Sequence, residues 1–279
     1  MNTLSKLTNK QKEILKLLYQ YRFLNRIQIQ AMMGHKDYKT INMWLKDLRE
    51  NGYVEWIYST HFAEKTKPAV YYLALNGIRY LKTLDNHSIE ELRKRYRESS
   101  RSQTYIDHCI LIADCCLSLE QARDDSDRAK QSWYFYQTGA DYIEESYYHF
   151  LVESESIRPD LCFSKEVYEG TGEPVSEKSY LLEIFDATLP RYRIKKRLTD
   201  YVTCLDDEGE EWKEATNTDT LPIILLVCPR VSDLIYAKRR TRGLLAEIWD
   251  EDEERPHIRF TTIEQLKVQG LLANIWEVA

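Results

Sequence analysis

The chain has 279 residues, with 39 Lys and Arg against 45 Asp and Glu, which gives a formal net charge of −6. Hydrophobic residues make up 43% of it and aromatic residues 12%, a composition typical of well-packed globular domains and not of a disordered chain. No apolar run is long enough to span a membrane and no apolar signal core opens the chain, so we expect a cytoplasmic protein that is neither inserted nor exported. The length predicts two domains.

The charge is distributed unevenly along the chain. Residues 1–105 hold 19 Lys and Arg against 10 Asp and Glu, a net of +9, whereas residues 106–279 hold 20 against 35, a net of −15. A basic segment neutralises phosphates and an acidic one repels them. The pattern therefore predicts that double-stranded DNA is bound from the N-terminal end.

The cysteines do not follow the spacing of zinc ligands, and most of them lie inside apolar segments. This predicts reduced core residues and no structural metal. The six are Cys109, Cys115, Cys116, Cys162, Cys204 and Cys228.

The first predicted helix covers about residues 9–21. Thr8 and Gln11 form a capping box in front of it, and branched apolar residues then recur on one helical face. Asn25 and Gln28 repeat the capping signal, which predicts a second helix of about two turns.

A third helix is predicted over residues 38–51, because apolar residues recur there at i, i+3, i+4 and i+7 and Asn51-Gly52 then stops it. With that apolar face turned inward, the remaining side chains point outward and are of the types that contact phosphates and base edges. These candidate DNA-binding residues are Tyr38, Lys39, Thr40, Asn42, Met43, Lys46 and Arg49.

Two β-strands are predicted next, at residues 53–58 and 69–73. The spacing of apolar residues there changes from the helical 3.6 towards the strand value of 2, and both segments are rich in aromatic and branched residues. Lys65 and Lys67 lie in the polar tip between them. Three helices, a hairpin and a short helix from Asn76 predict a winged helix-turn-helix domain over residues 1–85, with the tip lysines on the sugar-phosphate backbone. Two alternatives stay open: a winged helix that binds protein, and tip lysines that only keep a hairpin soluble.

Residues 86–104 are predicted to be a basic connector, with arginines and lysines clustered around a few apolar positions. The cluster extends the DNA contact surface or belongs to an exposed linker helix. From about residue 105 the pattern predicts an α/β domain around a mixed sheet. Its expected elements are a helix from Tyr105, strands near 133–136 and 158–163, a turn at 170–174, a strand at 180–185, a helix at 190–204, an acidic loop at 206–220, a strand at 221–228, a helix at 231–249 and a strand at 257–262.

Two carboxylates in this domain are candidates for chemistry. Asp160, in Arg158-Pro159-Asp160, enters one strand, and Glu183 lies in the next. The arrangement resembles the restriction-endonuclease-like fold, in which a Pro-Asp pair and a later Asp/Glu-x-Lys triplet bind magnesium and activate water. Phe185 stands at the lysine position of that triplet and cannot stabilise a charged transition state.

Basic residues on the following helix offer two readings of this pair. Lys195, Lys196 or Arg193 can replace the missing lysine, which makes Asp160, Glu183, Lys195 and Lys196 the candidate catalytic residues and the two carboxylates the candidate magnesium ligands. Alternatively, Asp160 caps a turn and Glu183 pairs with Arg191 or Arg193. Asp186 and Thr188 are expected to cap the 190–204 helix.

The whole chain also resembles the replication-relaxation family of plasmid and mobile-element proteins. The resemblance rests on the winged N-terminus, the helix that contains His108, Arg158-Pro159-Asp160, and the segment from Leu182 to Thr188 with its Glu-x-x-Asp-x-x-Thr spacing, followed by a basic helix as far as Tyr201. It implies a role in replication, mobilisation or regulation of an extrachromosomal element. His108 on its own is more simply explained as a core histidine with its hydrogen bonds satisfied.

These features together predict a DNA-binding protein of a plasmid or mobile element, with an inactive nuclease-like domain that supports assembly or binds a protein partner. A homodimer is expected, because one helix in one major groove contacts few base pairs. No cofactor is expected. The alternatives are a magnesium-dependent endonuclease and a transcription regulator whose C-terminal domain senses a ligand or partner.

Overall fold

The computed structural model describes residues 7–58, 67–84, 87–124, 131–138, 157–168, 176–216, 218–249 and 255–279. The chain divides into two compact units, Met1–Leu117 and Ser118–Ala279. Helix α6 (Gln103–Asp124) continues from the first unit into the second. The predicted domain limits at residues 85 and 104 stay predictions.

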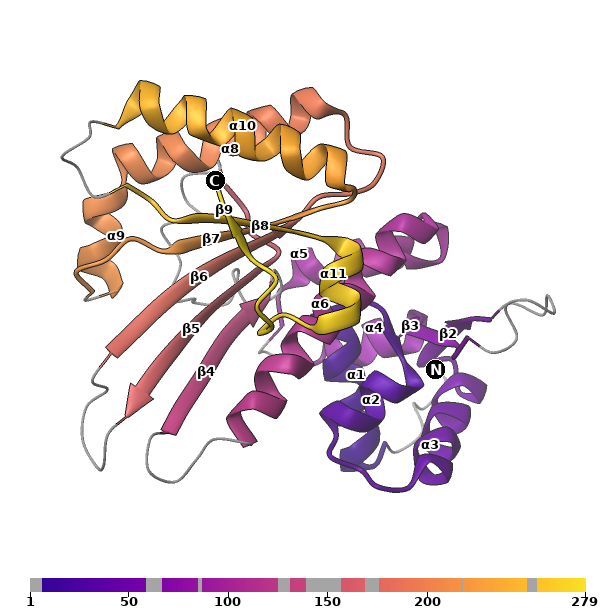
Figure 1. The fold of residues 1–279 in the computed structure, drawn as a ribbon. Helices are drawn as coiled ribbons and strands as arrows, with labels where there is room; N and C mark the ends of the chain where they lie inside the picture. Colours follow the sequence, from indigo (N-terminus) through magenta and orange to yellow (C-terminus); the bar gives the residue numbers. More distant parts are fainter. Residues whose placement is uncertain are drawn as a thin grey trace. The chain divides into compact units, whose positions relative to one another are not determined.

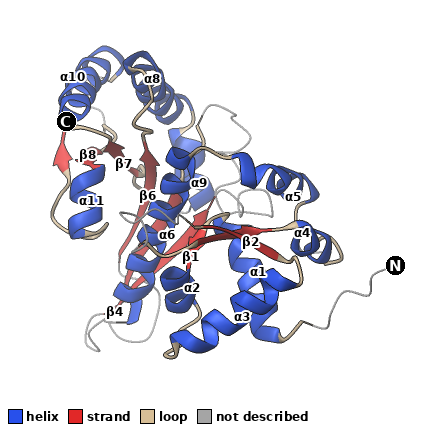
Figure 2. Ribbon diagram, turned by 90° about the vertical axis from the view of Figure 1, so that its right-hand side faces the viewer, coloured by secondary structure: helices blue, strands red, loops and turns tan. Residues whose placement is uncertain are grey.

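The first unit contains the helices and hairpin that the sequence predicts, grouped together in Figure 2. One short strand, two short helices and the start of α6 complete it. Its elements are α1 (Asn9–Tyr21), β1 (Leu24–Asn25), α2 (Arg26–Met32), α3 (Tyr38–Glu50), β2 (Val54–Ile57), β3 (Val70–Leu73), α4 (Leu75–Leu81), α5 (Ile89–Lys94), the 3-10 helix η1 (Arg95–Ser100) and the start of α6.

Local capping determines where the first helices begin. Both predicted capping boxes are present: Thr8 accepts from the backbone N–H of Gln11, and Asn25 accepts from that of Gln28. In α3, the Asp37 carboxylate accepts from the first-turn backbone. These caps satisfy N–H groups that would otherwise be unpaired, and so define the helix starts through local contacts.

The small sheet has the strand order β1-β3-β2, and all its pairs are antiparallel. Gly77 at the start of α4 lies so close to the Tyr53 carbonyl that a Cβ there would collide with it. Helices α1, α2 and α3 followed by this hairpin form a winged helix-turn-helix, as predicted. The hairpin tip, with Lys65, lies outside the described residues.

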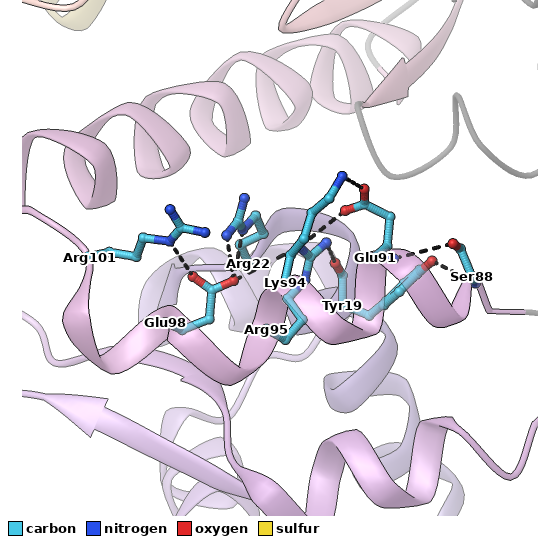
Figure 3. Close-up of polar contacts among 8 residues, drawn as sticks. All are labelled: Tyr19, Arg22, Ser88, Glu91, Lys94, Arg95, Glu98 and Arg101. Atoms are coloured by element: carbon cyan, nitrogen blue, oxygen red, sulfur yellow. Dashed lines mark hydrogen bonds and ion pairs between the residues drawn. The ribbon is translucent and has the colours of Figure 1, made fainter.

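The predicted connector is part of the first unit. Glu98 of η1 is fully buried and pairs with Arg22 at 2.8 Å, Arg101 at 3.5 Å and Arg95 at 3.9 Å. Figure 3 shows these groups converging beside Tyr19, whose carbonyl accepts from Arg95 Nη2 at 2.8 Å. The exposed-linker alternative is therefore wrong for the residues around Glu98.

Arg22 adopts an uncommon backbone conformation to reach this cluster. It ends α1 with φ 67° and ψ −52°, and it is not glycine, so the turn stores strain. Its guanidinium lies 4.8 Å from the ring centre of Tyr105 and donates from Nε to Glu98 at 2.8 Å. The buried ion pair with Glu98 and the contact with the Tyr105 ring stabilise the backbone turn at Arg22.

The second unit is an α/β domain on a mixed sheet, which confirms the predicted fold class (Figure 1). The strand order is β4-β5-β6-β7-β8-β9, with β6, β7 and β8 parallel and the outer pairs antiparallel. Its elements are β4 (Gln131–Thr138), β5 (Leu161–Tyr168), β6 (Ser176–Ile184), α8 (Arg191–Asp207), α9 (Gly209–Thr216), β7 (Ile223–Cys228), α10 (Val231–Ile248), β8 (Ile258–Thr262), α11 (Ile263–Gln269) and β9 (Glu277–Val278).

The core of this unit lies between the sheet and the helices α8 and α10. All residues of β7 are buried, since both faces of this central strand are covered. Figure 1 shows α8 and α10 side by side on one face of the sheet, with α11 on the other. Trp212 of α9 and Tyr201 of α8 are among the largest fully buried side chains.

Three details of the second unit differ from the sequence predictions. The expected acidic loop contains α9, which forms because Trp212 is drawn into the core. Thr262 and Gln265 form a capping box that opens α11, an element we did not expect. Asp186 accepts from the backbone and side chain of Thr188 at 2.7 and 2.8 Å, so it closes a turn and does not cap α8. The expected turn at 170–174 lies outside the described residues.

The six cysteines are all buried, as predicted for core residues. Among the described residues, no helix has both the length and the apolar character needed to cross a membrane.

Candidate functional site

The outer face of α3 presents most of the predicted DNA-binding side chains. Ile41, Leu45 and Leu48 are buried against the first unit, which turns the opposite side of the helix to solvent. The exposed members are Tyr38, Lys39, Asn42, Met43 and Lys46, while Thr40 and Arg49 are half-buried.

An aromatic cluster on the hairpin lies beside this face. The guanidinium carbon of Arg49 lies 3.8 Å from the ring centre of Trp56, and Trp56 stacks on Tyr58 with centroids 5.6 Å apart. Both rings are exposed although they are large and apolar. The aromatic ring holds Arg49 in a fixed orientation at the edge of α3.

A second arginine is held in the same way at the start of α3. The guanidinium carbon of Arg26 lies 5.6 Å from the ring centre of Tyr38, and Met43 is 60% exposed on the same helix. Sequence reasoning missed Arg26, Trp56 and Tyr58. The signal for the two aromatic residues is the aromatic content of the predicted strand, which by itself indicates only strand propensity. Lys67 is exposed before β3.

Asp160 and Glu183 are brought together in the second unit, as predicted. Asp160 lies directly before β5 and donates its backbone N–H to the Leu182 carbonyl at 2.9 Å. Its Oδ2 accepts from the backbone N–H of Ile184 at 2.7 Å. Asp160 is therefore bonded to Leu182 and Ile184, the two neighbours of Glu183 on β6.

Glu183 is buried and bonded to two side chains of α8. Arg197 donates from Nε to Oε1 at 3.0 Å and from Nη2 to Oε2 at 3.4 Å. The Tyr201 hydroxyl, one turn later, donates to Oε2 at 2.8 Å. Arg197 Nη2 also reaches the Arg158 carbonyl at 3.4 Å, which ties the helix to the strand entrance.

Burial dominates the electrostatics of this cluster. Desolvation and the nearby Asp160 carboxylate raise the pKa of Glu183 to about 7, against the lowering effect of Arg197 and Tyr201. Burial, with the Glu183 carboxylate next to it, raises the pKa of the Tyr201 hydroxyl well above its ordinary value. Tyr201 therefore stays protonated and donates to Glu183.

This arrangement does not fit a magnesium site. Magnesium needs carboxylate oxygens free to coordinate it, and both oxygens of Glu183 accept hydrogen bonds from Arg197 and Tyr201. The Arg197 guanidinium supplies the positive charge that an ion would bring. Within the described residues, His, Cys, Asp and Glu form no group of three able to hold a metal ion.

The other predicted basic residues of α8 point elsewhere. Lys196 pairs with Asp200 at 2.9 Å, and Lys195 is exposed. Arg191 donates to Asp233 at 3.3 Å, and Arg193 lies over the ring of Tyr192. The predicted pairing of Glu183 with Arg191 or Arg193 is therefore wrong, because Arg197 faces β6.

Two further residues can be placed. Phe185 is 1% exposed and belongs to the hydrophobic core, where it contributes no charge. His108 is half-buried in α6, with its ring stacked 6.5 Å from that of Tyr105.

A helix-turn-helix with an adjoining hairpin, in one chain with an α/β domain on a mixed sheet, defines a two-domain winged-helix protein. The profile of the replication-relaxation family matches residues 15–221, which is more than half of the chain and includes parts of both units. The chain belongs to the replication-relaxation family, and the predicted membership is confirmed.

Comparison with solved structures gives a weaker likeness. The structure of a Lactococcus lactis ZitR mutant matches 43% of this chain and 78% of its own, at 18% identity and a TM-score of 0.26. That TM-score is too low to establish a common fold. No curated protein sequence matches the chain significantly.

Proposed function

We propose that the chain binds duplex DNA by placing the outer face of α3 in the major groove. The observation that carries this proposal is the row of exposed polar and basic side chains on α3, beside which the Trp56 ring orients Arg49. These residues lie within a segment of net charge +9. Lysine and arginine side chains neutralise phosphates, and Asn42 and Arg49 are of the types that pair with base edges.

We propose further that this binding serves the replication, mobilisation or regulation of a plasmid or another mobile element. Membership of the replication-relaxation family supports a role connected with replication. In this proposal the second unit is nuclease-like in its strand order and carboxylate pair but does not cut DNA. The bonding of Glu183 to Arg197 and Tyr201 supports that.

The experiment that tests DNA binding uses the full chain. DNA is recovered from cells with the protein and sequenced, and its affinity for the purified chain is measured at several salt concentrations. The affinity is expected to fall steeply with salt, and Lys39→Ala, Lys46→Ala or Arg49→Ala each to weaken it and reduce the salt slope by about one. Lys16→Ala removes an exposed charge from α1 and serves as the matched control. An affinity that does not depend on salt contradicts the proposal.

The proposal includes a homodimer on a two-fold DNA site, because pairing doubles the number of base pairs contacted. Light scattering of the chain with and without DNA measures this directly. A protein mass of 33.2 kDa in both states contradicts it.

A further inference from the structure

The basic residues of the second unit are concentrated on two helices. Residues 106–279 have a net charge of −15, yet 9 of their 20 Lys and Arg lie within residues 191–197 of α8 and 238–242 of α10. The two helices lie side by side in Figures 1 and 2. Four of the nine pair with carboxylates: Arg191 with Asp233, Lys196 with Asp200, Arg197 with Glu183 and Lys238 with Glu277. The other five are exposed and give this otherwise acidic unit a positively charged surface: Arg193, Lys195, Arg239, Arg240 and Arg242.

A pocket of about 460 Å³ opens on this surface between α8 and α10. Lys195 lines it from α8, and α10 contributes Tyr236, Arg239 and Arg240 with one acidic residue, Glu247. Within the described part of the chain, Lys195 and Arg239 form no ion pair. Their charges are available to a ligand.

Tyr236 lines the pocket and contacts two arginines, of which Arg240 also lines the pocket. The guanidinium carbons of Arg191 and Arg240 lie 5.3 and 5.6 Å from its ring centre. Arg191 is also anchored by the buried carboxylate of Asp233. Oriented planar guanidiniums bind phosphate oxygens in pairs with little loss of side-chain freedom.

Gly243 keeps the pocket open. It lies in the interior of α10, where glycine costs a helix about 1 kcal/mol relative to alanine. A Cβ at this position would meet no atom within 4 Å, so packing does not require glycine there. Because Gly243 has no side chain, the space between Lys195 and Arg240 stays clear.

We propose that this pocket between α8 and α10 is a second DNA-contacting site, which binds phosphates of the DNA backbone. The inference rests on the proposed function for its choice of DNA as the polyanion. The charge, the arginines held by Tyr236 and the open space at Gly243 support it independently of α3. An acidic protein segment is the competing partner that the test must distinguish.

The test compares two variants of Gly243 with a control of equal charge change. Gly243→Glu places a negative charge in the pocket and should weaken DNA binding by the full chain about fivefold. Gly243→Ala adds one uncharged methyl group to the pocket and should weaken binding less than Gly243→Glu. Arg242→Ala removes one charge from an exposed position beside the pocket, so it measures the effect of net charge alone. Circular dichroism checks that each variant is folded.

A second pair of substitutions tests direct phosphate contact. The double variant Arg239→Ala, Arg240→Ala should lower the slope of log affinity against log salt by about two, one for each lost contact. Poly-glutamate, a polyanion without phosphate, is measured in parallel, and the pocket variants should weaken its binding no more than the same change of net charge at Arg242 does.

The outcomes separate this inference from the proposed function. If the wild type binds no DNA, both fail. If it binds DNA and Arg49→Ala weakens binding, but Gly243→Glu behaves like Arg242→Ala, only the second site is overturned. If the pocket variants lose affinity for poly-glutamate but keep their affinity for DNA, the surface binds an acidic protein and the inference is again overturned.

Discussion

Arg197 donates from Nε to Glu183 Oε1 at 3.0 Å and thereby joins helix α8 to strand β6. The carboxylate is buried, and 31% of the arginine side chain is exposed. A guanidinium thus occupies the neighbourhood where the sequence suggested a magnesium ion. We therefore expect the stability of the second unit to depend on this pair, and the pair to oppose metal binding and DNA cleavage there.

Arg197→Ala should destabilise the chain by about 3 kcal/mol at pH 8, because it leaves a buried carboxylate without its partner. The loss should be smaller at pH 5, where Glu183 is protonated. Urea unfolding at the two pH values measures both effects. Arg193→Ala, an exposed arginine of the same helix, is the control and should change little. Equal losses for the two variants would contradict the prediction.

The raised pKa of Glu183 makes stability depend on pH in a defined direction. Its ordinary pKa is 4.5 and its folded pKa is about 7, so the folded state holds the proton more tightly than the unfolded state. The resulting stabilisation is complete below pH 4.5 and is lost as pH rises through about 7. Glu183→Gln should remove this contribution. A difference between wild type and variant that stays constant from pH 4.5 to 8 would refute it.

We expect no DNA cleavage by the full chain in magnesium or manganese. Hydrolysis needs a positioned water and a positive group beside the scissile phosphate, whereas Arg197 is bound to Glu183 and Phe185 is buried in the core. Supercoiled and linear DNA are the substrates, with Asp160→Ala and Glu183→Ala as controls. Cleavage by the wild type that both substitutions abolish would show an active nuclease.

Trp56 should contribute to DNA binding through Arg49, which it holds at 3.8 Å. Trp56→Ala frees the guanidinium and should weaken binding, whereas Trp56→Phe keeps a ring and should weaken it less. A double-mutant cycle with Arg49→Ala should give a coupling of about 0.5–1 kcal/mol. Strictly additive effects on DNA affinity would mean that the two residues act separately.

Glu98 should be essential to the stability of the first unit. It is fully buried, and Glu98→Gln would leave Arg22, Arg95 and Arg101 around a neutral amide. We expect a loss of about 3 kcal/mol in the free energy of unfolding. Glu90→Gln changes an exposed glutamate of α5 and is the matched control. The prediction fails if the two variants unfold at the same denaturant concentration.

The N-terminal fold could be predicted from sequence because its signals are local. Thr8 and Asn25 cap helices through residues three positions away, and the apolar spacing of α3 alone places Lys39 and Asn42 on its outer side. Each of these interactions is made within one or two turns. The position of the residues along the chain therefore suffices to predict them.

The carboxylate pair of the second unit could be predicted only in part. Its two strands carry Asp160 and Glu183, and strand pairing brings them together. Which arginine pairs with Glu183 depends on how α8 is rotated over the sheet, and the sequence suggested Arg191 or Arg193. Burial of Tyr201 sets the rotation and selects Arg197, one turn earlier.

The sequence by itself determined the winged helix, the outward face of α3, the mixed sheet and the juxtaposition of Asp160 with Glu183. The tertiary structure alone decided the helical state of α9, the packing of the connector around Glu98, the partner of Glu183 and the pocket at Gly243. The physical reason is sequence distance. Caps and periodic faces involve neighbours along the chain, whereas burial and ion pairing involve residues far apart in it, and their free energies exist only once the core has formed.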